Sequence, residues 1–350
     1  MKHKTGFGNH CILIEGAGTA TAISVIKGLS EPEVQQCKTV MVDADDFVAG
    51  RYFADKFYKT PSSKDEKYIE FMLDICKKEG VDIYIPIIDY GFEKLSNNKQ
   101  KFKDSGIYLM IADYPSIKIC ADKYLTYTYF INNNIPTPKT FEFKNHKNIS
   151  YDKSYIMKPR SDGRASLDVH KISSLQEVES VAKDNTNYII QEFITGKEFT
   201  ADCLNNLDGT MFINAVIRER VETKGGLATK ARIFDKILSD KIKVYLKKIS
   251  EGLRLPGVYN IQGFIKNNEE IYFTEINPRF AGTHVMNIKA GVNSIHFLLQ
   301  MIDGIPPEKI QKSININHNI RMLRYWNEIF IDGDLSDGEV SAWNHLLKKH

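Results

Sequence analysis

Apolar segments and amphipathic segments alternate along the first 116 residues, and this alternation is the strongest constraint on the fold. A short apolar run, Cys11 to Ile14, leads into a glycine-containing turn, and Thr21 to Leu29 then has the pattern of a helix. Further apolar runs follow at Val81 to Ile88 and at Gly106 to Ile111. Strands and helices at this spacing predict a parallel sheet. We therefore expect a doubly wound α/β domain that ends near Ser116.

The first turn contains Gly16-Ala17-Gly18 and allows two interpretations. A dinucleotide-binding turn has the pattern Gly-x-Gly-x-x-Gly, but Thr21 occupies the third glycine position. Asp43, just after the Val40–Val42 strand, could bind a ribose or belong to a solvated loop. A dinucleotide-dependent oxidoreductase is therefore one alternative. We expect instead that the glycines let the chain turn toward a substrate, and that they bind no nicotinamide cofactor.

After residue 116 the pattern changes to a helix, Ile117 to Phe130, and then to strands joined by hairpin turns. The expected turns include Asn206–Gly209 and Asn267–Glu270. Between Arg218 and Lys230, a Gly225-Gly226 pair lies among charged residues, which favours a mobile loop that closes over a ligand. A late strand is expected over Ile320–Phe330.

The β-rich stretch from Ile271 to His284 brings Glu275, Asn277 and Arg279 in quick succession. Alternate side chains of a strand share a face, so Glu275 and Asn277 point the same way. Their oxygens suit Mg²⁺, while Pro278 ends the strand because it has no N–H group for a ladder. A metal with the Arg279 guanidinium fits a transferring phosphoryl group. The alternative is an edge strand whose polar side chains face water.

Composition excludes several classes of protein. The chain has 350 residues, 42% hydrophobic content and a net charge of +3, which are ordinary for two or three globular domains and do not favour nucleic-acid binding. No apolar run approaches the roughly 20 residues that span a bilayer, and the N-terminus lacks an apolar signal core, so a cytoplasmic location is expected. The five cysteines form no Cys-x-x-Cys pair, which favours free thiols.

A series of motifs, in the order in which they occur, resembles the ATP-grasp superfamily. The series is Lys123, Lys158-Pro159, the small-residue loop 160–166, Gln191-Glu192-Phe193-Ile194, Glu198, Gln262 and Glu275-x-Asn277-Pro278-Arg279. The likeness is greatest to the synthetase halves of the carbamoyl-phosphate synthetase large subunit and to peptide-type carboxylate–amine ligases, and it covers nearly the whole chain. It implies an α/β domain over 1–116, a small ATP-grasp lobe over 117–192, a large lobe over 193–331 and a tail over 332–350.

The resemblance also implies roles for individual residues. Lys123 and Lys158 would bind the inner phosphates of ATP, and Gly163, Arg164 and Ser166 would belong to the phosphate loop. Glu192, Phe193 and Ile194 would form the hinge that reads the adenine, and Glu198 would bind the ribose. Mg²⁺, or Mn²⁺ in its place, would be bound by Gln262, Glu275 and Asn277. Catalysis would rest on Arg279 at the γ-phosphate, with Lys158 and with Arg218 and Arg220 facing the substrate, and His284 nearby.

The chain departs from the family pattern in two respects. Only Gly163 remains in a phosphate loop that is usually glycine-rich, and Ala165 and Asp168 stand where glycine is expected. Arg160 and Arg164 could compensate with side-chain cations. The chain also has one synthetase unit where carbamoyl-phosphate synthetase has two, which favours a stand-alone ligase.

The resemblance therefore implies an enzyme that phosphorylates a carboxylate with MgATP and passes the acyl group to an amine or ammonia, with ADP and phosphate as products. Its partners would be a small carboxylate and an amine, with a homodimer as a candidate assembly and no nucleic acid or membrane. Two alternatives remain: phosphorylation of a bicarbonate- or carbamate-type carboxylate, and a non-catalytic ATP-binding module.

Overall fold

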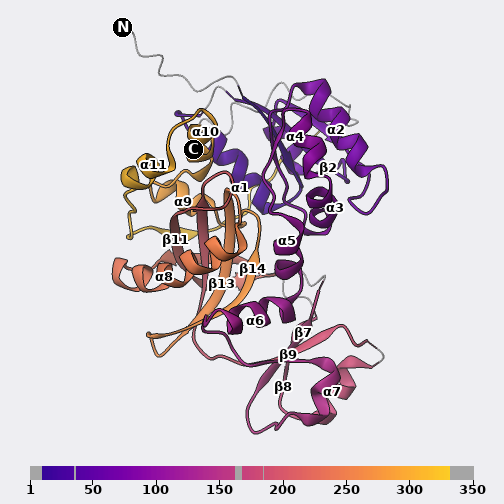
Figure 1. Cartoon of the computed structure of the whole chain (residues 1–350), viewed down its shortest axis with the longest axis vertical. Coiled ribbons are helices and arrows are strands. Elements are labelled where there is room, and N and C mark those ends of the chain that lie inside the picture. Colours follow the sequence, from indigo (N-terminus) through magenta and orange to yellow (C-terminus); the bar gives the residue numbers. More distant parts are fainter. Residues whose placement is uncertain (1–9, 35–36, 162–167, 184, 332–350) are drawn as a thin grey trace.

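The computed structural model describes residues 10–34, 37–161, 168–183 and 185–331, and within these ranges the chain forms three sheets. Figure 1 shows the N-terminal α/β domain at one end of the molecule, the small sheet around β7 to β9 at the other end, and the large sheet between them. The N-terminal segment before residue 10 and the expected tail over 332–350 lie outside the described residues.

The N-terminal sheet confirms the doubly wound prediction. Its five parallel strands have the order β3-β2-β1-β4-β5. The strands are β1 (Cys11–Glu15), β2 (Lys38–Asp43), β3 (Lys56–Lys59), β4 (Ile83–Ile85) and β5 (Tyr108–Leu109). The helices are α1 (Ala20–Leu29), α2 (Tyr68–Glu79), α3 (Phe92–Asn97) and α4 (Lys99–Asp104), with short 3₁₀ turns at Ala49–Phe53 and Asp89–Gly91. Strand β3 was not expected from the sequence.

Alternate residues of β1 explain why helices cover both faces of this sheet. Leu13 belongs to a core cluster that includes Met72 of α2, whereas Ile12 and Ile14 belong to a second cluster that includes Val25 of α1. All of β1 is buried, as expected for a central parallel strand. The turn after β1 uses Gly16 at φ +71°, and the N–H of Gly18 donates to Asp43 at 2.8 Å. Asp43 therefore holds the glycine turn.

The expected helix over 117–130 is divided into two helices, α5 (Tyr114–Ala121) and α6 (Lys123–Asn132). The break lies at Asp122, whose backbone is extended and whose carboxylate accepts hydrogen bonds from the N–H groups of Tyr124 and Leu125. A carboxylate that bonds the first free N–H groups begins a new helix. Lys123 is therefore the first residue of α6.

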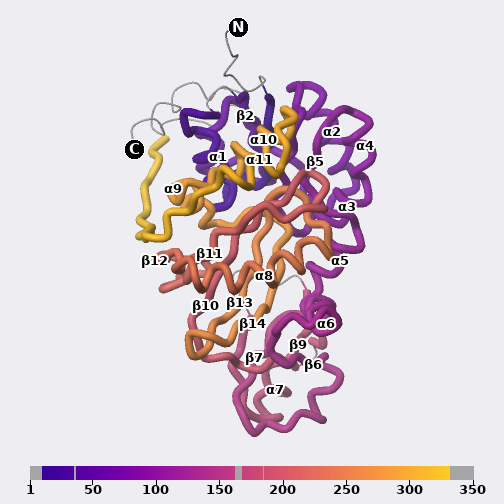
Figure 2. The backbone as a smooth tube through the Cα atoms, turned by 60° about the vertical axis from the view of Figure 1, so that its left-hand side comes forward, coloured from indigo at the N-terminus to yellow at the C-terminus, as the bar shows by residue number. Residues whose placement is uncertain are grey.

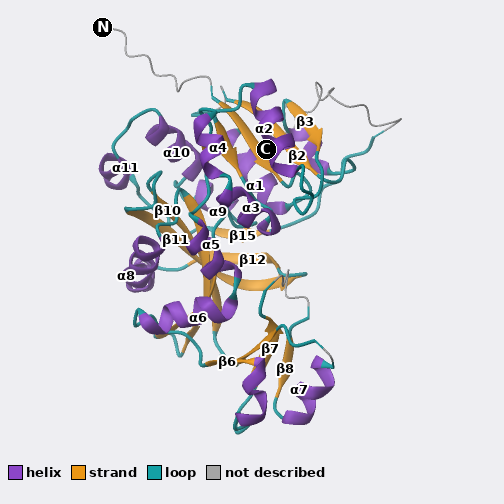
Figure 3. Ribbon diagram, turned by 45° about the vertical axis from the view of Figure 1, so that its right-hand side comes forward, coloured by secondary structure: helices purple, strands orange, loops and turns teal. Residues whose placement is uncertain are grey.

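The small sheet is antiparallel, with the order β6-β9-β7-β8. Its strands are β6 (Thr140–Glu142), β7 (Tyr155–Pro159), β8 (His170–Ile172) and β9 (Tyr188–Glu192), and α7 (Leu175–Ala182) lies beside it with a 3₁₀ turn over Phe143–Asn148. Figure 3 shows these short strands and α7 grouped apart from the rest of the molecule.

The large sheet has six strands in the order β14-β13-β10-β11-β12-β15, all antiparallel to their neighbours. They are β10 (Lys197–Asn205), β11 (Phe212–Lys224), β12 (Leu227–Ile233), β13 (Val258–Lys266), β14 (Glu270–Asn277) and β15 (Arg321–Leu323). Helix α8 (Lys236–Leu253) packs Ile242, Leu246 and Ile249 into the same core cluster as Phe199 of β10. The expected hairpins at 206–209 and 267–270 are both present.

The prediction of a mobile loop over Arg218–Lys230 is wrong, because this segment is a β-hairpin. Strand β11 continues to Lys224 and β12 begins at Leu227, so only Gly225 and Gly226 form the turn, at φ +53° and +75°. Two glycines at positive φ make the tight turn that joins antiparallel strands. The charges that suggested a loop pair across the hairpin, Glu222 with Lys230 and Glu219 with Arg232.

The late strand is shorter than expected: only Arg321–Leu323 pairs with β12, and Tyr325 and Trp326 beyond it are exposed. Three helices precede it, α9 (Val285–Lys289), α10 (Ser294–Ile302) and α11 (Pro307–Ser313). In the described ranges, no helix combines the length and apolar character that crossing a membrane requires.

Helix α10 joins the large lobe to the N-terminal domain. It lies beside α1 in Figure 2, and Ile295 and Leu298 of α10 share a core cluster with Ile26 of α1. Gly28 permits this contact, since a Cβ atom there would lie 2.9 Å from the Cδ1 atom of Ile295. The carboxyl edge of the N-terminal sheet is thereby held close to the end of β14.

Glu15, the last residue of β1, is a buried carboxyl at that edge. It accepts hydrogen bonds from the Tyr68 hydroxyl and, at 3.1 Å each, from the N–H groups of Ile87 and Ile88. Burial raises the pKa of Glu15 to about 7, although these hydrogen bonds to the carboxylate oppose the rise. In an unfolded chain the same carboxyl has its ordinary, lower pKa.

We expect the stability contributed by Glu15 to decrease as the pH rises. Between about pH 4.5 and pH 7 the folded protein binds a proton that the unfolded chain has lost. Above that window the carboxyl is ionised in both states, and its burial lowers the free energy of unfolding by up to about 3 kcal/mol. Glu15→Gln does not titrate. The melting temperature of the native protein should therefore fall relative to Glu15→Gln between about pH 5 and pH 8. The variant Glu70→Gln, at an exposed position, should show the same pH dependence as the native protein. If the melting temperatures of the native protein and of Glu15→Gln differ equally at about pH 5 and pH 8, the raised pKa of Glu15 is contradicted.

Candidate active site

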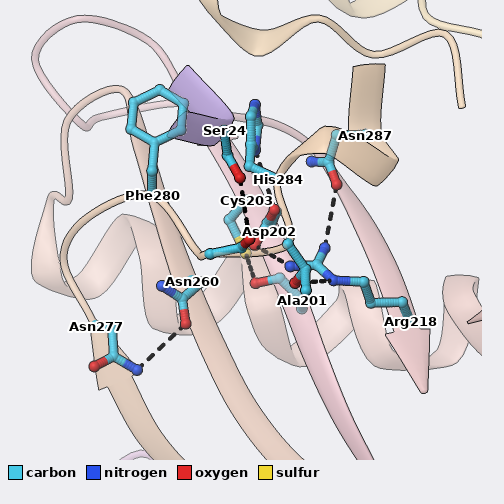
Figure 4. A network of polar contacts seen from close by, with 12 residues as sticks. Ser24, Ala201, Asp202, Cys203, Arg218, Asn260, Asn277, Phe280, His284 and Asn287 are labelled. Carbon is cyan, nitrogen blue, oxygen red and sulfur yellow. Dashed lines mark hydrogen bonds and ion pairs between the residues drawn. The ribbon is translucent and has the colours of Figure 1, made fainter. Parts of the chain in front are cut away.

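The end of β14 places the expected metal-binding residues together. Gln262 of β13 is the cross-strand partner of Glu275, and Asn260 is the partner of Asn277. Glu275 also has a side-chain hydrogen bond with Asn277, which confirms that the two side chains lie on one face. Asn277 is 9% exposed, and its side-chain N–H donates to the Asn260 oxygen at 3.3 Å, as Figure 4 shows. Its own oxygen is thereby directed away from Asn260.

Glu275 is surrounded by positive charge. Burial alone would raise the pKa of its carboxyl, but Lys123, Lys158 and Arg279 outweigh burial and lower that pKa. Glu275 is therefore ionised near neutral pH. The structure brings together residues from α6, β7 and the segment after β14, as the ordered motifs led us to expect.

Lys158 lies in β7 and its ammonium is enclosed. It donates to the side-chain oxygen of Gln191 at 3.0 Å, and Gln191 in turn donates to Thr140 at 2.9 Å. Burial lowers the pKa of the Lys158 ammonium to about 8, which the attraction of Glu275 offsets only in part. Gln191 belongs to one of the ordered motifs, but no role was predicted for it. Its position next to Lys158 follows from the pairing of β7 with β9.

Lys123 reaches the same group because the end of β7 is bound to the start of α6. The N–H of Lys123 donates to the carbonyl of Arg160 at 3.0 Å, and the Arg160 guanidinium donates to Asp122 at 2.7 Å and to Glu142 at 3.0 Å. Arg160 is thus engaged by two carboxylates. The expectation that it compensates for the missing glycines as a phosphate-facing cation is not supported by these contacts.

The rest of the expected phosphate loop, Gly163, Arg164 and Ser166 together with Ala165, lies outside the described residues. Asp168, which follows it, adopts φ +58° and bonds His170 and Tyr188. A positive φ is the conformation for which glycine is favoured. Residue 168 therefore has a backbone conformation that suits the expected glycine, but it carries an aspartate side chain.

The expected nucleotide hinge follows β9. The N–H groups of Glu192 and Phe193 already donate to the carbonyls of Lys139 and Ser154. In the described part of the chain, the N–H of Ile194 is the one of the three without a hydrogen bond. The Phe193 ring is 36% exposed and lies 4.4 Å from the ammonium of Lys171.

Glu198 and Arg220 form an ion pair between β10 and β11. Burial raises the pKa of the Glu198 carboxyl, and the charge of Arg220 offsets only part of that rise. Arg220 also donates to the carbonyl of Gly226 at the hairpin turn. A ribose at Glu198 would share this carboxylate with Arg220.

Arg218 has a different environment from the one expected of a loop residue. It is fully buried and donates to Asp202 at 2.9 Å, Thr283 at 2.7 Å and Asn287 at 3.2 Å, so all three guanidinium nitrogens are bonded. Asp202 also bonds His284 at 3.1 Å. Figure 4 shows this network joining β10 and β11 to the segment after β14. Arg218 is buried and holds that segment in place, so the expected substrate-facing loop position does not describe it.

Two residues that contact the end of β14 were missed from the sequence. Asn260 donates to the carbonyl of Arg279 at 2.9 Å, and Asp89 of the N-terminal domain accepts from the Nε of Arg279 at 3.0 and 3.1 Å. The available signal for Asp89 was its place just after a parallel strand, at the edge where such sheets bind ligands.

The donor set fits a hard divalent cation. In the described ranges, no cluster of three or more His, Cys, Asp or Glu side chains could hold a metal ion. One ionised carboxylate, Glu275, stands with the amides of Asn277 and Gln262. Mg²⁺ is bound in this way when substrate phosphates complete its coordination. A divalent cation held by these oxygens could, together with Lys123, Lys158 and Arg279, neutralise a phosphoryl group.

Comparisons with known proteins show two family matches in the chain. The family model described as "PylC-like, N-terminal domain" matches residues 12–110, and the model described as "ATP-grasp domain" matches residues 120–283. The carbamoyl phosphate synthase large chain of Clostridium acetobutylicum is 24% identical over 312 residues, which is 83% of this chain but only 27% of that protein. The tyramine–L-glutamate ligase of Methanocaldococcus fervens is 28% identical over 239 residues, 66% of this chain and 72% of that protein.

A solved structure shares the fold. It is the biotin carboxylase domain of 2-oxoglutarate carboxylase from Hydrogenobacter thermophilus, described as a dimer in complex with MgADP, ADP and bicarbonate. The TM-score is 0.65 at 14% sequence identity, over 84% of this chain and 69% of that one.

We expect the affinity for MgATP to fall as the pH rises through about 8. Lys158 has a lowered pKa of about 8 in the free protein and must be charged to bind phosphate, so at about pH 9 only roughly a tenth carries the charge. Calorimetry should show binding that weakens on the order of tenfold from about pH 7 to about pH 9. Lys158→Arg, which stays charged, should lose this pH dependence. A native affinity that is constant across this range would contradict the assignment.

Proposed function

We propose that this chain, which carries an ATP-grasp domain behind a PylC-like N-terminal domain, is an ATP- and Mg²⁺-dependent ligase that joins a carboxylate to an amine through an acyl phosphate. The observation that carries the proposal is the convergence of Lys123, Lys158 and Arg279 on Glu275. The similarity to a tyramine–L-glutamate ligase supports the carboxylate–amine class.

In the proposed first step, a substrate carboxylate oxygen attacks the γ-phosphorus of ATP. A phosphorus–oxygen bond forms to the carboxylate and the bond to the β-phosphate oxygen breaks, which gives an acyl phosphate and ADP. Arg279 would stabilise the charge on the transferring group, while Lys123 and Lys158 would hold the inner phosphates of the leaving ADP. A Mg²⁺ ion held by Glu275, Asn277 and Gln262 would neutralise further negative charge on the phosphates.

In the second step the neutral amine attacks the acyl carbon. A carbon–nitrogen bond forms, the bond to phosphate breaks, and the amine loses a proton, so the products are an amide, inorganic phosphate and ADP. This chemistry needs positioned charges and no covalent enzyme nucleophile. Attack at the α-phosphorus would instead call for the main cationic group beside the ribose, where Glu198 is the proposed contact.

A related function shares the first step. The similarity to a carbamoyl phosphate synthase large chain extends over 83% of this chain and favours phosphorylation of a bicarbonate- or carbamate-type carboxylate as the second candidate. The two candidates differ in the carboxylate that stimulates ADP release and in the need for a second amine.

The decisive experiment measures ADP release over a panel of amino acids, small carboxylic acids and bicarbonate, each with and without an added amine. The stimulating carboxylate is then labelled with ¹⁸O. We expect one label to appear in inorganic phosphate. Stoichiometric pyrophosphate, or label in AMP, would rule out the acyl-phosphate route. Nucleotide binding without turnover across the whole panel would indicate an ATP-binding module.

We expect Glu275→Gln to lower turnover by about 10²–10³-fold while the protein remains folded. The variant removes a preorganised charge opposite three cations, and effects of this size are typical when one such group is lost. Glu270→Gln, at the exposed start of the same strand, is the matched control and should keep native turnover. Near-native turnover of Glu275→Gln at ordinary Mg²⁺ would refute the role given to Glu275.

A further inference from the structure

Arg279 is held from two sides. Its Nε donates to both oxygens of Asp89, at 3.0 and 3.1 Å, and its Nη1 donates to the carbonyl of Phe280 at 3.1 Å. In the described part of the chain, Nη2 is the guanidinium nitrogen with no hydrogen bond. A planar guanidinium fixed at Nε and Nη1 has its remaining N–H groups directed by those two contacts.

The contact that fixes Nε comes from the N-terminal domain. Asp89 begins the short 3₁₀ turn after β4, at the carboxyl edge of the parallel sheet, and is 190 residues from Arg279 in sequence. The backbone that leads into it is fixed by Glu15, which accepts from the N–H groups of Ile87 and Ile88. The position of Asp89 therefore depends on the first and fourth strands of a different domain.

The pair is too exposed to matter chiefly for stability. The Asp89 side chain is 53% exposed and that of Arg279 is 22% exposed. Solvent-exposed ion pairs contribute little to the free energy of folding, with a usual range of about 0–1 kcal/mol. A weak but well-oriented contact can still select the direction of a long side chain, which is what a phosphate-facing arginine needs.

We propose that Asp89 is a positioning residue of the active site: from the N-terminal domain it aims the guanidinium of Arg279 at the terminal phosphate of ATP. This inference rests on the proposed function only where that function places Arg279 at the γ-phosphate. It follows that the terminal-phosphate subsite of the ATP-grasp domain is complete only with the N-terminal domain docked against it. Asp89 itself touches no phosphate, because its negative charge would repel one.

The experiment compares two nucleotides that differ at the terminal phosphate. Calorimetry with Mg²⁺ measures the affinities of ADP and of the β,γ-imido analogue of ATP, so no turnover is needed. Asp89→Asn keeps the size of the side chain but loses its charge. We expect it to weaken binding of the analogue about fivefold to tenfold and to leave ADP binding unchanged, as befits the loss of one charge-assisted hydrogen bond to a partly exposed group.

A double-mutant cycle tests whether Asp89 acts through Arg279. Lysine cannot reproduce the Nε contact, so Asp89→Asn should have no further effect in an Arg279→Lys background. Asp89→Glu should restore part of the preference for the analogue. Asp113→Asn removes another exposed acid of the same region, one that pairs with Lys99, and is the control expected to match the native protein. Thermal unfolding of each variant shows whether it is folded.

The outcomes separate this inference from the proposed function. Effects of Asp89→Asn that add to those of Arg279→Lys, an equal loss of ADP and analogue binding, or a native protein with no preference for the analogue would each overturn the role of Asp89. If the nucleotide results are as expected but no carboxylate stimulates ADP release, the proposed ligase activity fails and the positioning role stands.

Discussion

The candidate active site depends on one partly buried carboxylate, that of Glu275, whose ionised form three nearby cations stabilise. Lys123, Lys158 and Arg279 come from separate segments and would repel one another without Glu275 between them. The repulsion is visible at Lys158, whose pKa is lowered by burial and further by Lys123. The negative charge of Glu275 offsets part of this repulsion. The three cations can therefore be held close to one another in the folded protein.

The polar end of β14 could be predicted from the sequence because strand parity is a local rule. Glu275 and Asn277 share a face wherever the strand is placed, and Pro278 must end it. The order of the lysines along the chain added the family pattern, and the structure places Lys123 and Lys158 near Glu275. The shared face of Glu275 and Asn277 and the end of the strand at Pro278 follow from neighbouring residues alone, so the sequence is enough to predict them.

The hairpin over 212–233 could not be recognised in the same way. A pair of glycines among charges is equally typical of a mobile loop and of a tight turn, and the ion pairs that decide between them, such as Glu222 with Lys230, form only across the strands. Asp89 and Asn260 were missed for a related reason. Arg279 lies 190 residues beyond Asp89 and 19 beyond Asn260, so each contact depends on how the chain folds back and not on a local pattern.

The bond between α6 and β7 has a mechanical consequence. The N–H of Lys123 is bonded to the carbonyl of Arg160, and the side chain of Arg160 is bonded to Asp122, so the start of the helix and the end of the strand are clamped at two points. Helix α6 is also tied to the large sheet, because it packs against β14, where the ring of Phe130 meets that of Phe273. A rotation of the small sheet relative to the large one would therefore have to break the bond between Lys123 and Arg160 or shift α6 on β14. The start of α6 thus couples the position of the small sheet to the spacing between the two lysines and Glu275.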